Sequence, residues 1–362
     1  MRPGVIDWCP RATAEPMRIV VTGATGFLGA AVARRLHVQG YDVLATGRDR
    51  TRGALLTEAG IAFRPAELSD RRAIDDLCAG AATVVHCAAL SSPWGPKQAF
   101  VRSNIEATDA LIAACQRSRV ARLVHISTPS LYMGARDFSL ARPSARFDRE
   151  GVREDDPLGH PVNHYASTKL ECERRVRAAL ARGLPSIILR PRAIFGPGDT
   201  TIFPRVLRAL ETGRLPVIGN GQNRVDLTYI DNAVQAIVCA LDAPSVAWGQ
   251  TYNITNGEPV LLWEVLRWLC AELKLPAPRG SLPVGLGMLL GGALELFHHV
   301  ARPHVEPKLT RYSVQVLGCT MTLDIRRARE QLGYAPAVSM QEGLARFVAW
   351  WVEQNREQVC RE

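Results

Sequence analysis

The first half of the chain alternates short apolar runs with longer amphipathic stretches. Residues 18–22 have the pattern of a buried strand, and residues 27–39 repeat apolar side chains at helical spacing before Gly40. Further strands are predicted at 42–46, 83–88, 122–127 and 186–190, and further helices at 98–117 and 163–182. Strands that alternate with helices indicate βαβ units, whose right-handed crossovers produce a doubly wound parallel sheet in an α/β fold.

After residue 194 the pattern changes, because segments shorten and Gly and Pro become frequent. Short apolar runs in 226–256 are expected to return to the sheet. The predicted boundaries are 17–194 with 226–256 for the sheet domain, 195–225 with 257–362 for a smaller mixed α/β domain, and 1–16 for a disordered extension. That first segment has no apolar region of a signal peptide, so we expect a cytoplasmic protein, with Met17 as an alternative start.

A glycine-rich turn joins the first predicted strand to the first predicted helix. Gly23, Gly26 and Gly29 are spaced GxxGxxG. Glycine lets backbone N–H groups approach a pyrophosphate, and the helix N-terminus adds partial positive charge. Between a buried strand and an amphipathic helix, this motif predicts a dinucleotide site of the Rossmann type. The predicted loop residues are Gly23, Thr25, Gly26, Phe27, Leu28 and Gly29.

The end of the second predicted strand decides between NAD and NADP, because an acid there would bind the ribose 2′-hydroxyl. Gly47 stands where the acid would be, and Arg48 follows it. A guanidinium suits a 2′-phosphate, and no carboxylate at Gly47 repels one. We therefore expect NADP as the cofactor, with NAD as the alternative if Asp49 compensates.

Tyr165 and Lys169 stand four residues apart in the predicted helix 163–182. Side chains at this spacing share one helix face, so the phenol and the ammonium can converge. A free tyrosine titrates near a pKa of ~10, and a nearby cation favours the phenolate. Tyr165 is therefore predicted to be a general acid toward a ketone or a general base toward an alcohol, while Lys169 holds the cofactor ribose.

Hydroxyl groups follow the predicted strand 122–127, at the sheet edge where doubly wound folds bind ligands. Ser127, Thr128 and Ser130 are all candidates to hydrogen-bond the substrate oxygen and orient it toward Tyr165. Asn104, in the predicted helix 98–117, is a candidate catalytic residue that joins a proton relay or fixes a water. A helix-side polar contact is the alternative role for Asn104.

The order of these motifs resembles the extended short-chain dehydrogenases/reductases of the NAD-dependent epimerase/dehydratase superfamily. The matching segments are GATGFLG at 23–29, HCAA at 86–89, SNIEAT at 103–108, STPSLY at 127–132, YASTK at 165–169 and RPRAIFGPGD at 190–199. The resemblance places the family's catalytic Ser/Thr at Thr128, and it implies a homodimer through helices 98–117 and 164–182. It also implies cofactor contacts at Glu67, Leu68, Cys87, Ala88, Ala89, Pro191 and Ile194.

Three activities compete within this family. The segments YIDN at 229–232 and EPKLTRYSV at 306–314 resemble the 3β-hydroxysteroid dehydrogenase branch, which includes 2-alkyl-3-oxoalkanoate reductases. This resemblance favours interconversion of a ketone and a secondary alcohol on a small lipophilic substrate. The first alternative is a nucleotide-sugar 4-epimerase, although its usual Arg-Asp clasp is here displaced to Arg224-Val225-Asp226. The second is a non-catalytic NADP-sensing protein, which the catalytic side chains disfavour.

Composition adds few constraints to this interpretation. The formal charge of +9 comes from dispersed Arg rather than from a basic block, so we do not expect a nucleic-acid partner. The nine Cys show no metal-ligand spacing, so we expect no metal site, and the lack of a secretory signal indicates a reducing compartment. Residues 282–297 are strongly apolar. They predict a buried or lid helix, or else a surface that admits a lipophilic substrate or contacts a membrane.

Overall fold

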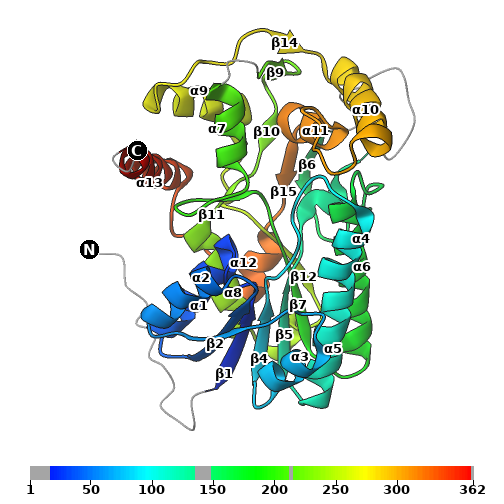
Figure 1. The fold of residues 1–362 in the computed structure, drawn as a ribbon, viewed down its shortest axis with the longest axis vertical. Helices are drawn as coiled ribbons and strands as arrows, with labels where there is room; N and C mark the ends of the chain where they lie inside the picture. The colour runs from blue at the N-terminus through cyan, green and yellow to red at the C-terminus, as the bar shows by residue number, and fades with distance from the viewer. Residues whose placement is uncertain (1–16, 135–147, 212–214, 360–362) are drawn as a thin grey trace.

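A seven-stranded sheet forms the larger part of the molecule (Figure 1). The computed structural model describes residues 17–134, 148–211 and 215–359, so the predicted extension 1–16 lies outside the described residues. The strand order is β3-β2-β1-β4-β5-β7-β12, and all neighbours are parallel, which confirms the predicted doubly wound sheet. The strands are β1 (Arg18–Thr22), β2 (Asp42–Gly47), β3 (Ala62–Pro65), β4 (Thr83–His86), β5 (Arg122–Ile126), β7 (Ser186–Pro191) and β12 (Thr251–Ile254).

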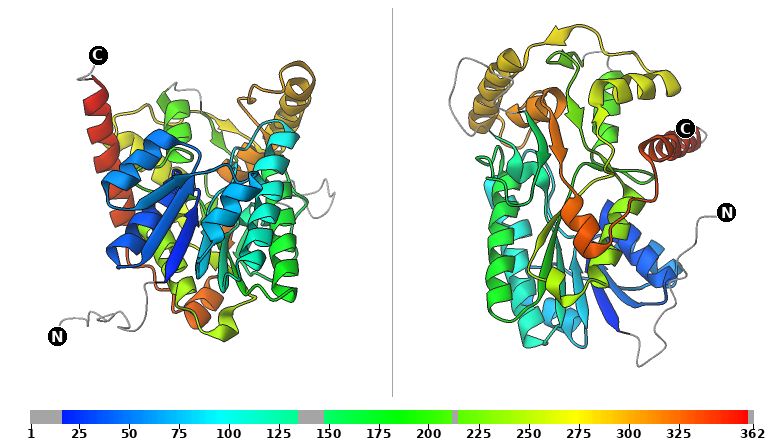
Figure 2. Two further views of the ribbon diagram at one scale, coloured as in Figure 1. Left: turned by 60° about the horizontal axis from the view of Figure 1, so that its bottom comes forward. Right: turned by 180° about the vertical axis from the view of Figure 1, so that it is seen from behind.

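Helices cover both faces of this sheet (Figure 2). One face carries α1 packed against α8, and the other carries α3, α5 and α6 packed in series. These helices are α1 (Phe27–Val38), α2 (Arg50–Glu58), α3 (Arg71–Cys78), α5 (Ala107–Arg117), α6 (His164–Ala181) and α8 (Ile230–Leu241). The chain continues to opposite sides of the sheet from β1 and from β4, so the carboxyl ends of these two neighbours mark the ligand-binding edge.

The helix predicted at 98–117 is present, but it is not an α-helix throughout. It consists of α4 (Lys97–Phe100), a π-helical turn η1 (Val101–Glu106) and α5. Asn104 lies in the π-helical turn, and its side chain hydrogen-bonds the backbone of Leu90 in the loop after β4. Turns of this kind are rare in helices and are found mostly at functional sites.

A smaller part sits above the carboxyl edge of the sheet (Figure 1). Its four-stranded sheet has the order β13-β10-β15-β6 and mixes parallel and antiparallel pairs. Of the two runs expected to return to the main sheet, Thr251–Ile254 does so, whereas β11 pairs with β8 instead. The strands are β6 (Arg149–Val152), β8 (Ile194–Phe195), β9 (Val217–Ile218), β10 (Arg224–Val225), β11 (Thr228–Tyr229), β13 (Val260–Leu261), β14 (Ser281–Leu282) and β15 (Met321–Leu323). The remaining helices of the chain are η2 (Pro129–Tyr132), α7 (Phe203–Glu211), η3 (Ser245–Ala247), α9 (Leu262–Glu272), α10 (Val284–Ala301), α11 (Arg311–Gly318), α12 (Arg326–Leu332) and α13 (Met340–Val359). Of these, η2 packs on α6, and α12 packs with η3 on α8 and β12 of the larger part.

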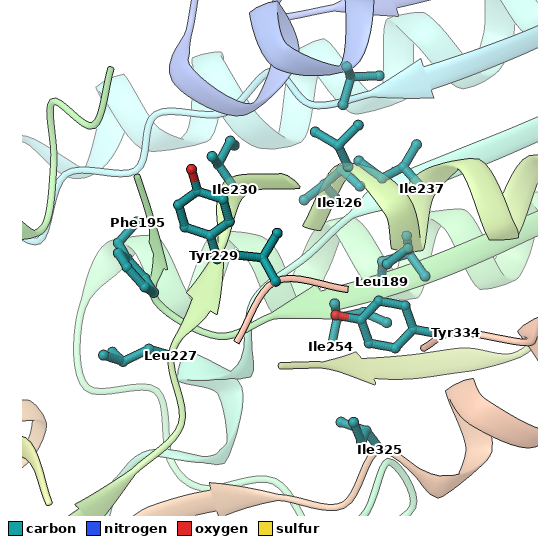
Figure 3. Close-up of a cluster of buried hydrophobic side chains, with 14 of the residues drawn as sticks. Ile126, Leu189, Phe195, Leu227, Tyr229, Ile230, Ile237, Ile254, Ile325 and Tyr334 are labelled. Carbon is teal, nitrogen blue, oxygen red and sulfur yellow. The ribbon is translucent and has the colours of Figure 1, made fainter. Parts of the chain in front are cut away.

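One continuous apolar core joins the two parts (Figure 3). Ile126 and Leu189 reach it from the main sheet, and Phe195 and Tyr229 from the small two-stranded sheet. Tyr334 closes it from the C-terminal side, and its hydroxyl donates to the Thr255 carbonyl at 2.9 Å. Full burial of each large apolar side chain contributes about 1.5–3 kcal/mol, so the two parts are stabilised as one unit.

Helix α10 contains most of the apolar run 282–297. It is long and apolar enough to span a bilayer by length and composition alone, yet only 22% of it is buried. The buried-helix interpretation is therefore wrong. Its exposed apolar side chains are Leu286, Leu289, Leu290, Leu294, Leu296, Phe297 and Val300. Glu295 faces inward and accepts hydrogen bonds from the backbone and side-chain nitrogens of Arg311, both at 2.7 Å, which attaches α10 to α11.

A buried ion pair attaches helix α6 to the sheet. Arg190 at the end of β7 donates to both carboxylate oxygens of Glu173 on α6, at 2.8 and 2.6 Å. Arg190 also stacks on the ring of Tyr132 in η2, 5.0 Å from its centroid, and the Tyr132 hydroxyl donates to Asn253 on β12. The pair thus fixes three elements around the end of β7.

Arg190→Met is expected to lower the free energy of unfolding by about 3–5 kcal/mol, because it leaves the Glu173 carboxylate buried without its main partner. Urea denaturation measures the change. Glu171→Gln is the matched control, since Glu171 lies on the same helix and its ion pairs among the described residues are with Arg174 and Arg175, which are both partly exposed. The control should lose less than about 1 kcal/mol. Equal losses in both variants would contradict the role given to the buried pair.

Candidate active site

The glycine turn between β1 and α1 has the shape that a pyrophosphate requires. Gly23 has φ +67°, and a Cβ there would lie 2.7 Å from the backbone nitrogen of Ala88. A Cβ on Gly29 would lie 2.3 Å from the Gly23 carbonyl oxygen. Helix α1 begins after Gly26 without a side-chain cap, so its first N–H groups are available to a ligand. This site therefore fits a dinucleotide phosphate.

The other predicted cofactor residues lie along the same edge of the sheet. Arg48 and Glu67 follow β2 and β3, and their side chains stand 3.8 Å apart at the surface. Asp49 caps α2 by accepting the backbone N–H of Arg52 at 3.0 Å. The remaining positions are the loop residues Thr25, Phe27 and Leu28, then Leu68 after β3, Cys87, Ala88 and Ala89 after β4, and Pro191 and Ile194 in β7 and β8.

Tyr165 stands at the start of α6 and faces the hydroxyls that follow β5. Burial raises the pKa of its phenol above the usual range, and a hydrogen bond with Thr128 acts in the opposite direction. Of the three hydroxyl candidates, Thr128 is therefore the one that the structure places against Tyr165. The Thr128 hydroxyl also donates to the Ser130 hydroxyl at 3.1 Å and accepts the Ser130 backbone N–H.

Lys169 is buried one turn further along α6, but its ammonium does not point at the Tyr165 phenol as the spacing predicts. It donates to the Ile126 carbonyl at 2.6 Å and lies 3.2 Å from Nε2 of His125. Burial lowers the pKa of Lys169. A backbone carbonyl is a stronger acceptor than a neutral phenol, so the ammonium binds the end of β5.

Two buried histidines that sequence analysis did not select lie under this site. Burial is the main cause that lowers the pKa of both His86 and His125, so both are neutral at physiological pH. Nδ1 of His86 lies 2.8 Å from the Thr22 hydroxyl, and Nε2 lies 3.1 Å from the Thr108 hydroxyl. The HCAA and VHIS segments contained both histidines, but only the sheet register shows that they are neighbours.

Asn104 acts as a clamp in this structure. Its Oδ1 accepts the Leu90 backbone N–H at 2.7 Å, while Nδ2 donates to the Leu90 carbonyl and to the Thr168 hydroxyl at 3.0 Å. These contacts tie the loop after β4 to helix α6, next to Lys169. The catalytic role predicted for Asn104 stays a prediction, and its polar contacts match the alternative role.

Tyr312 and Arg192 are further site residues that sequence analysis did not select. The Tyr312 hydroxyl lies 3.2 Å from the Ser130 hydroxyl, and its phenol affects the pKa of both Tyr165 and Arg192. Tyr312 comes from α11, far along the chain. It lies in the segment 306–314 that resembled a family branch, and this was the only sequence signal for it.

A family model described as "NAD dependent epimerase/dehydratase family" matches residues 19–255. The chain belongs to this family. It is accordingly a nicotinamide-dependent enzyme of the short-chain dehydrogenase/reductase class.

Relatives of known name span nearly the whole chain. A 2-alkyl-3-oxoalkanoate reductase from Stenotrophomonas maltophilia is 36% identical, with 92% of this chain and 99% of the relative covered. The mouse sterol-4-alpha-carboxylate 3-dehydrogenase, decarboxylating, is 27% identical over 91% of this chain and 90% of the relative. The UDP-glucuronic acid 4-epimerase of Bacillus cereus in complex with NAD matches with a TM-score of 0.70 at 23% identity, covering 93% of this chain and 99% of that one. At that identity the epimerase structure shows the shared fold alone.

Gly29→Ala is expected to weaken dinucleotide binding and to lower stability by about 1–3 kcal/mol, because its Cβ would overlap the Gly23 carbonyl. Fluorescence titration with NADPH and thermal unfolding measure the two effects. Gly292→Ala is the control, since its nearest neighbour, Arg311 Cδ, would be 3.6 Å away. Alanine in that helix should be neutral or stabilising by about 0.5–1 kcal/mol. Unchanged NADPH affinity in Gly29→Ala would contradict the assignment of this turn.

Proposed function

We propose that this protein is an NADP-dependent oxidoreductase that interconverts a ketone and a secondary alcohol on a lipophilic substrate. The contact between the Tyr165 phenol and the Thr128 hydroxyl, at the edge of the sheet beside the glycine turn, carries this proposal. Two oxygen-bearing groups of this kind can hold one substrate oxygen between them.

The chain's own residues account for the proton. A bound nicotinamide supplies or accepts the hydride. In ketone reduction the substrate carbonyl accepts hydrogen bonds from Thr128 and Tyr165, and the Tyr165 O–H bond breaks as its proton passes to the carbonyl oxygen. The raised pKa of Tyr165 keeps this proton in place at neutral pH. In alcohol oxidation the same proton returns to the phenolate.

Lys169 contributes positive charge beside this reaction. Two of its N–H donors serve Ile126 and His125, which leaves a third for a cofactor ribose hydroxyl. Burial raises the pKa of the nearby Cys87 thiol, and the charge of Lys169 acts in the opposite direction. Cys87 is one of the predicted cofactor contacts. Because His125 is neutral, nothing repels the ammonium from this position.

The surface beside the site supports a lipophilic substrate. His299 of α10 lies 4.5 Å from Trp94 in the loop after β4, measured between ring centroids, and 6.2 Å from His164, the neighbour of Tyr165. The exposed apolar helix α10 thus lies beside the start of α6, where Tyr165 stands. The names of the two enzyme relatives, an oxoalkanoate reductase and a sterol dehydrogenase, support the same class of substrate.

Three features favour NADP over NAD. A Cβ on Gly47 would lie 2.4 Å from the Thr25 hydroxyl oxygen, so an acid at position 47 would need Thr25 to move. The Asp49 carboxylate is already engaged as the cap of α2. Arg48 is exposed at this end of β2, where a guanidinium can bind a phosphate.

Tyr165→Phe is expected to lower the rate of ketone reduction by about 10²–10⁴-fold, because the variant lacks the acidic proton. NADPH oxidation in the presence of a panel of alkyl and cyclic ketones measures the rate. Cofactor affinity should be unchanged, since the ring stays in place. Full activity of Tyr165→Phe would refute the proposed mechanism. Turnover of UDP-sugars without any ketone turnover would favour the epimerase alternative.

Arg48→Gln is expected to raise the Michaelis constant for NADPH about tenfold, because the variant loses one charge-assisted hydrogen bond of about 1.4 kcal/mol. The Michaelis constant for NADH should stay unchanged. Steady-state kinetics with both cofactors measures the selectivity. Arg64→Gln is the control, because this exposed arginine on the adjacent β3 bonds the Asp76 carbonyl instead. A wild-type enzyme that uses NADH as well as NADPH would overturn the preference.

A further inference from the structure

Two arginines at the end of β7 differ sharply in their pairing. Arg190 forms an ion pair with Glu173 and stacks on the ring of Tyr132. Arg192, two residues later, is also buried, with only 5% of its surface exposed. Within the described residues its Nε has no hydrogen-bond partner. The Nε–H group of Arg192 has therefore lost its water without gaining a hydrogen-bond partner in this part of the chain.

The groups around Arg192 balance its positive charge only in part. Burial lowers its pKa, while Tyr312 and Asp226 act through space in the opposite direction. Asp226 is itself buried, and one of its carboxylate oxygens accepts the Leu323 backbone N–H at 2.6 Å. Burial raises the pKa of Asp226 to about 6. Asp226 therefore offsets part of the charge of Arg192 but provides no direct ion pair.

A buried charge without a partner is costly, so chains rarely keep one without a functional reason. An arginine cannot avoid the cost by losing its proton, because its pKa lies too high. The side chain that suits an unpaired guanidinium best is a carboxylate, whose two oxygens match its fork of N–H donors.

Tyr312 connects Arg192 to the reacting groups. Its phenol interacts through space with the guanidinium of Arg192 and with the phenol of Tyr165, and it raises the pKa of both groups. Its hydroxyl contacts Ser130, which in turn contacts Thr128. Arg192 and Thr128 follow the neighbouring parallel strands β7 and β5, so both lie at the same edge of the sheet. An acid group near the reacting carbon is therefore within the reach of the same site.

We propose that Arg192 is a specificity-determining residue that binds a carboxylate carried by the substrate close to its reacting carbonyl. The enzyme then acts on 3-oxo and 3-hydroxy acids in preference to their esters and to simple ketones. This inference rests on the proposed function, since it assumes that Thr128 and Tyr165 hold the reacting oxygen. It goes beyond that function by naming the group that the site recognises and the side chain that does so.

The first test compares substrates on the wild-type enzyme. Oxidation is the suitable direction, because 3-oxo acids lose carbon dioxide on standing. The substrates are 3-hydroxydecanoate, its methyl ester and 2-decanol, each with NADP⁺ and with NAD⁺. We expect kcat/KM for the acid to exceed that for the ester by about 10- to 100-fold, as one charged hydrogen bond provides. Equal values for acid and ester would overturn the proposal for Arg192.

The second test removes the guanidinium. Arg192→Gln should lower kcat/KM for 3-hydroxydecanoate by about 10- to 100-fold and leave the methyl ester nearly unchanged, while Arg192→Lys should recover part of the loss. Arg224→Gln is the matched control, because the exposed Arg224 also acts on Asp226 through space. The control should keep the preference for the acid. Equal losses for acid and ester in Arg192→Gln would indicate a merely structural role.

Binding gives a readout that does not depend on turnover. Decanoate with NADP⁺ should raise the Tm of the wild-type protein and of Arg224→Gln, but not that of Arg192→Gln, and decanol should not reproduce the shift. A shift that survives in Arg192→Gln would refute the carboxylate site. If decanoate binds through Arg192 but none of the three alcohols is oxidised, the proposed function fails and the carboxylate site stands. If the ester and 2-decanol are oxidised as fast as the acid, the function stands and the inference fails.

Discussion

The reacting phenol is held in place by a buried ion pair two turns further along its helix. Tyr165 begins α6, and Glu173 on the same helix is fixed by Arg190 of β7. Arg190 also stacks on Tyr132, the last residue of the short helix η2 that starts after Thr128. The ion pair therefore helps to position Tyr165 and Thr128, the two groups that would hold the substrate oxygen in the proposed mechanism. A buried ion pair adds little net stability over an apolar pair, but it fixes a geometry.

The buried cations at this edge of the sheet differ in how their charge is balanced. Lys169 is buried against a carbonyl and a neutral histidine, so its ammonium is positioned without being neutralised. Arg190 is neutralised completely, whereas Arg192 is not. Of three buried cations around the ends of β5 and β7, the one paired with an acid therefore has a structural role. The two without such a pair face the cofactor and the substrate in the proposed mechanism.

Local sequence patterns predicted the parts of the site that depend on neighbouring residues. The glycine turn, the phenol and the hydroxyls follow from short motifs with a fixed geometry, and the parallel sheet follows from alternating elements. The position of the Lys169 ammonium could not be predicted, because it depends on the Ile126 carbonyl of β5, which lies far from Lys169 along the chain. Tyr312 and the neighbouring histidines were missed for a related reason, since contacts across more than a hundred residues or between strands leave no local pattern. The sequence left open whether α10 is buried or exposed, because an apolar run alone does not show which face is covered.

Helix α11 relates the two unusual features of this chain, the exposed apolar helix and the unpaired arginine. Arg311 at its start binds Glu295 and so holds α10 beside the active site. Tyr312, the next residue, contacts the Ser130 hydroxyl and acts through space on the pKa of Arg192. Both features are unfavourable in free energy when nothing is bound: the apolar surface because it is exposed to water, and the buried cation because it lacks an anion. Helix α11 interacts with both of them. A single amphiphilic substrate of the proposed kind, with an apolar tail and a carboxylate near its carbonyl, would offset both costs at once while its carbonyl is held by Tyr165.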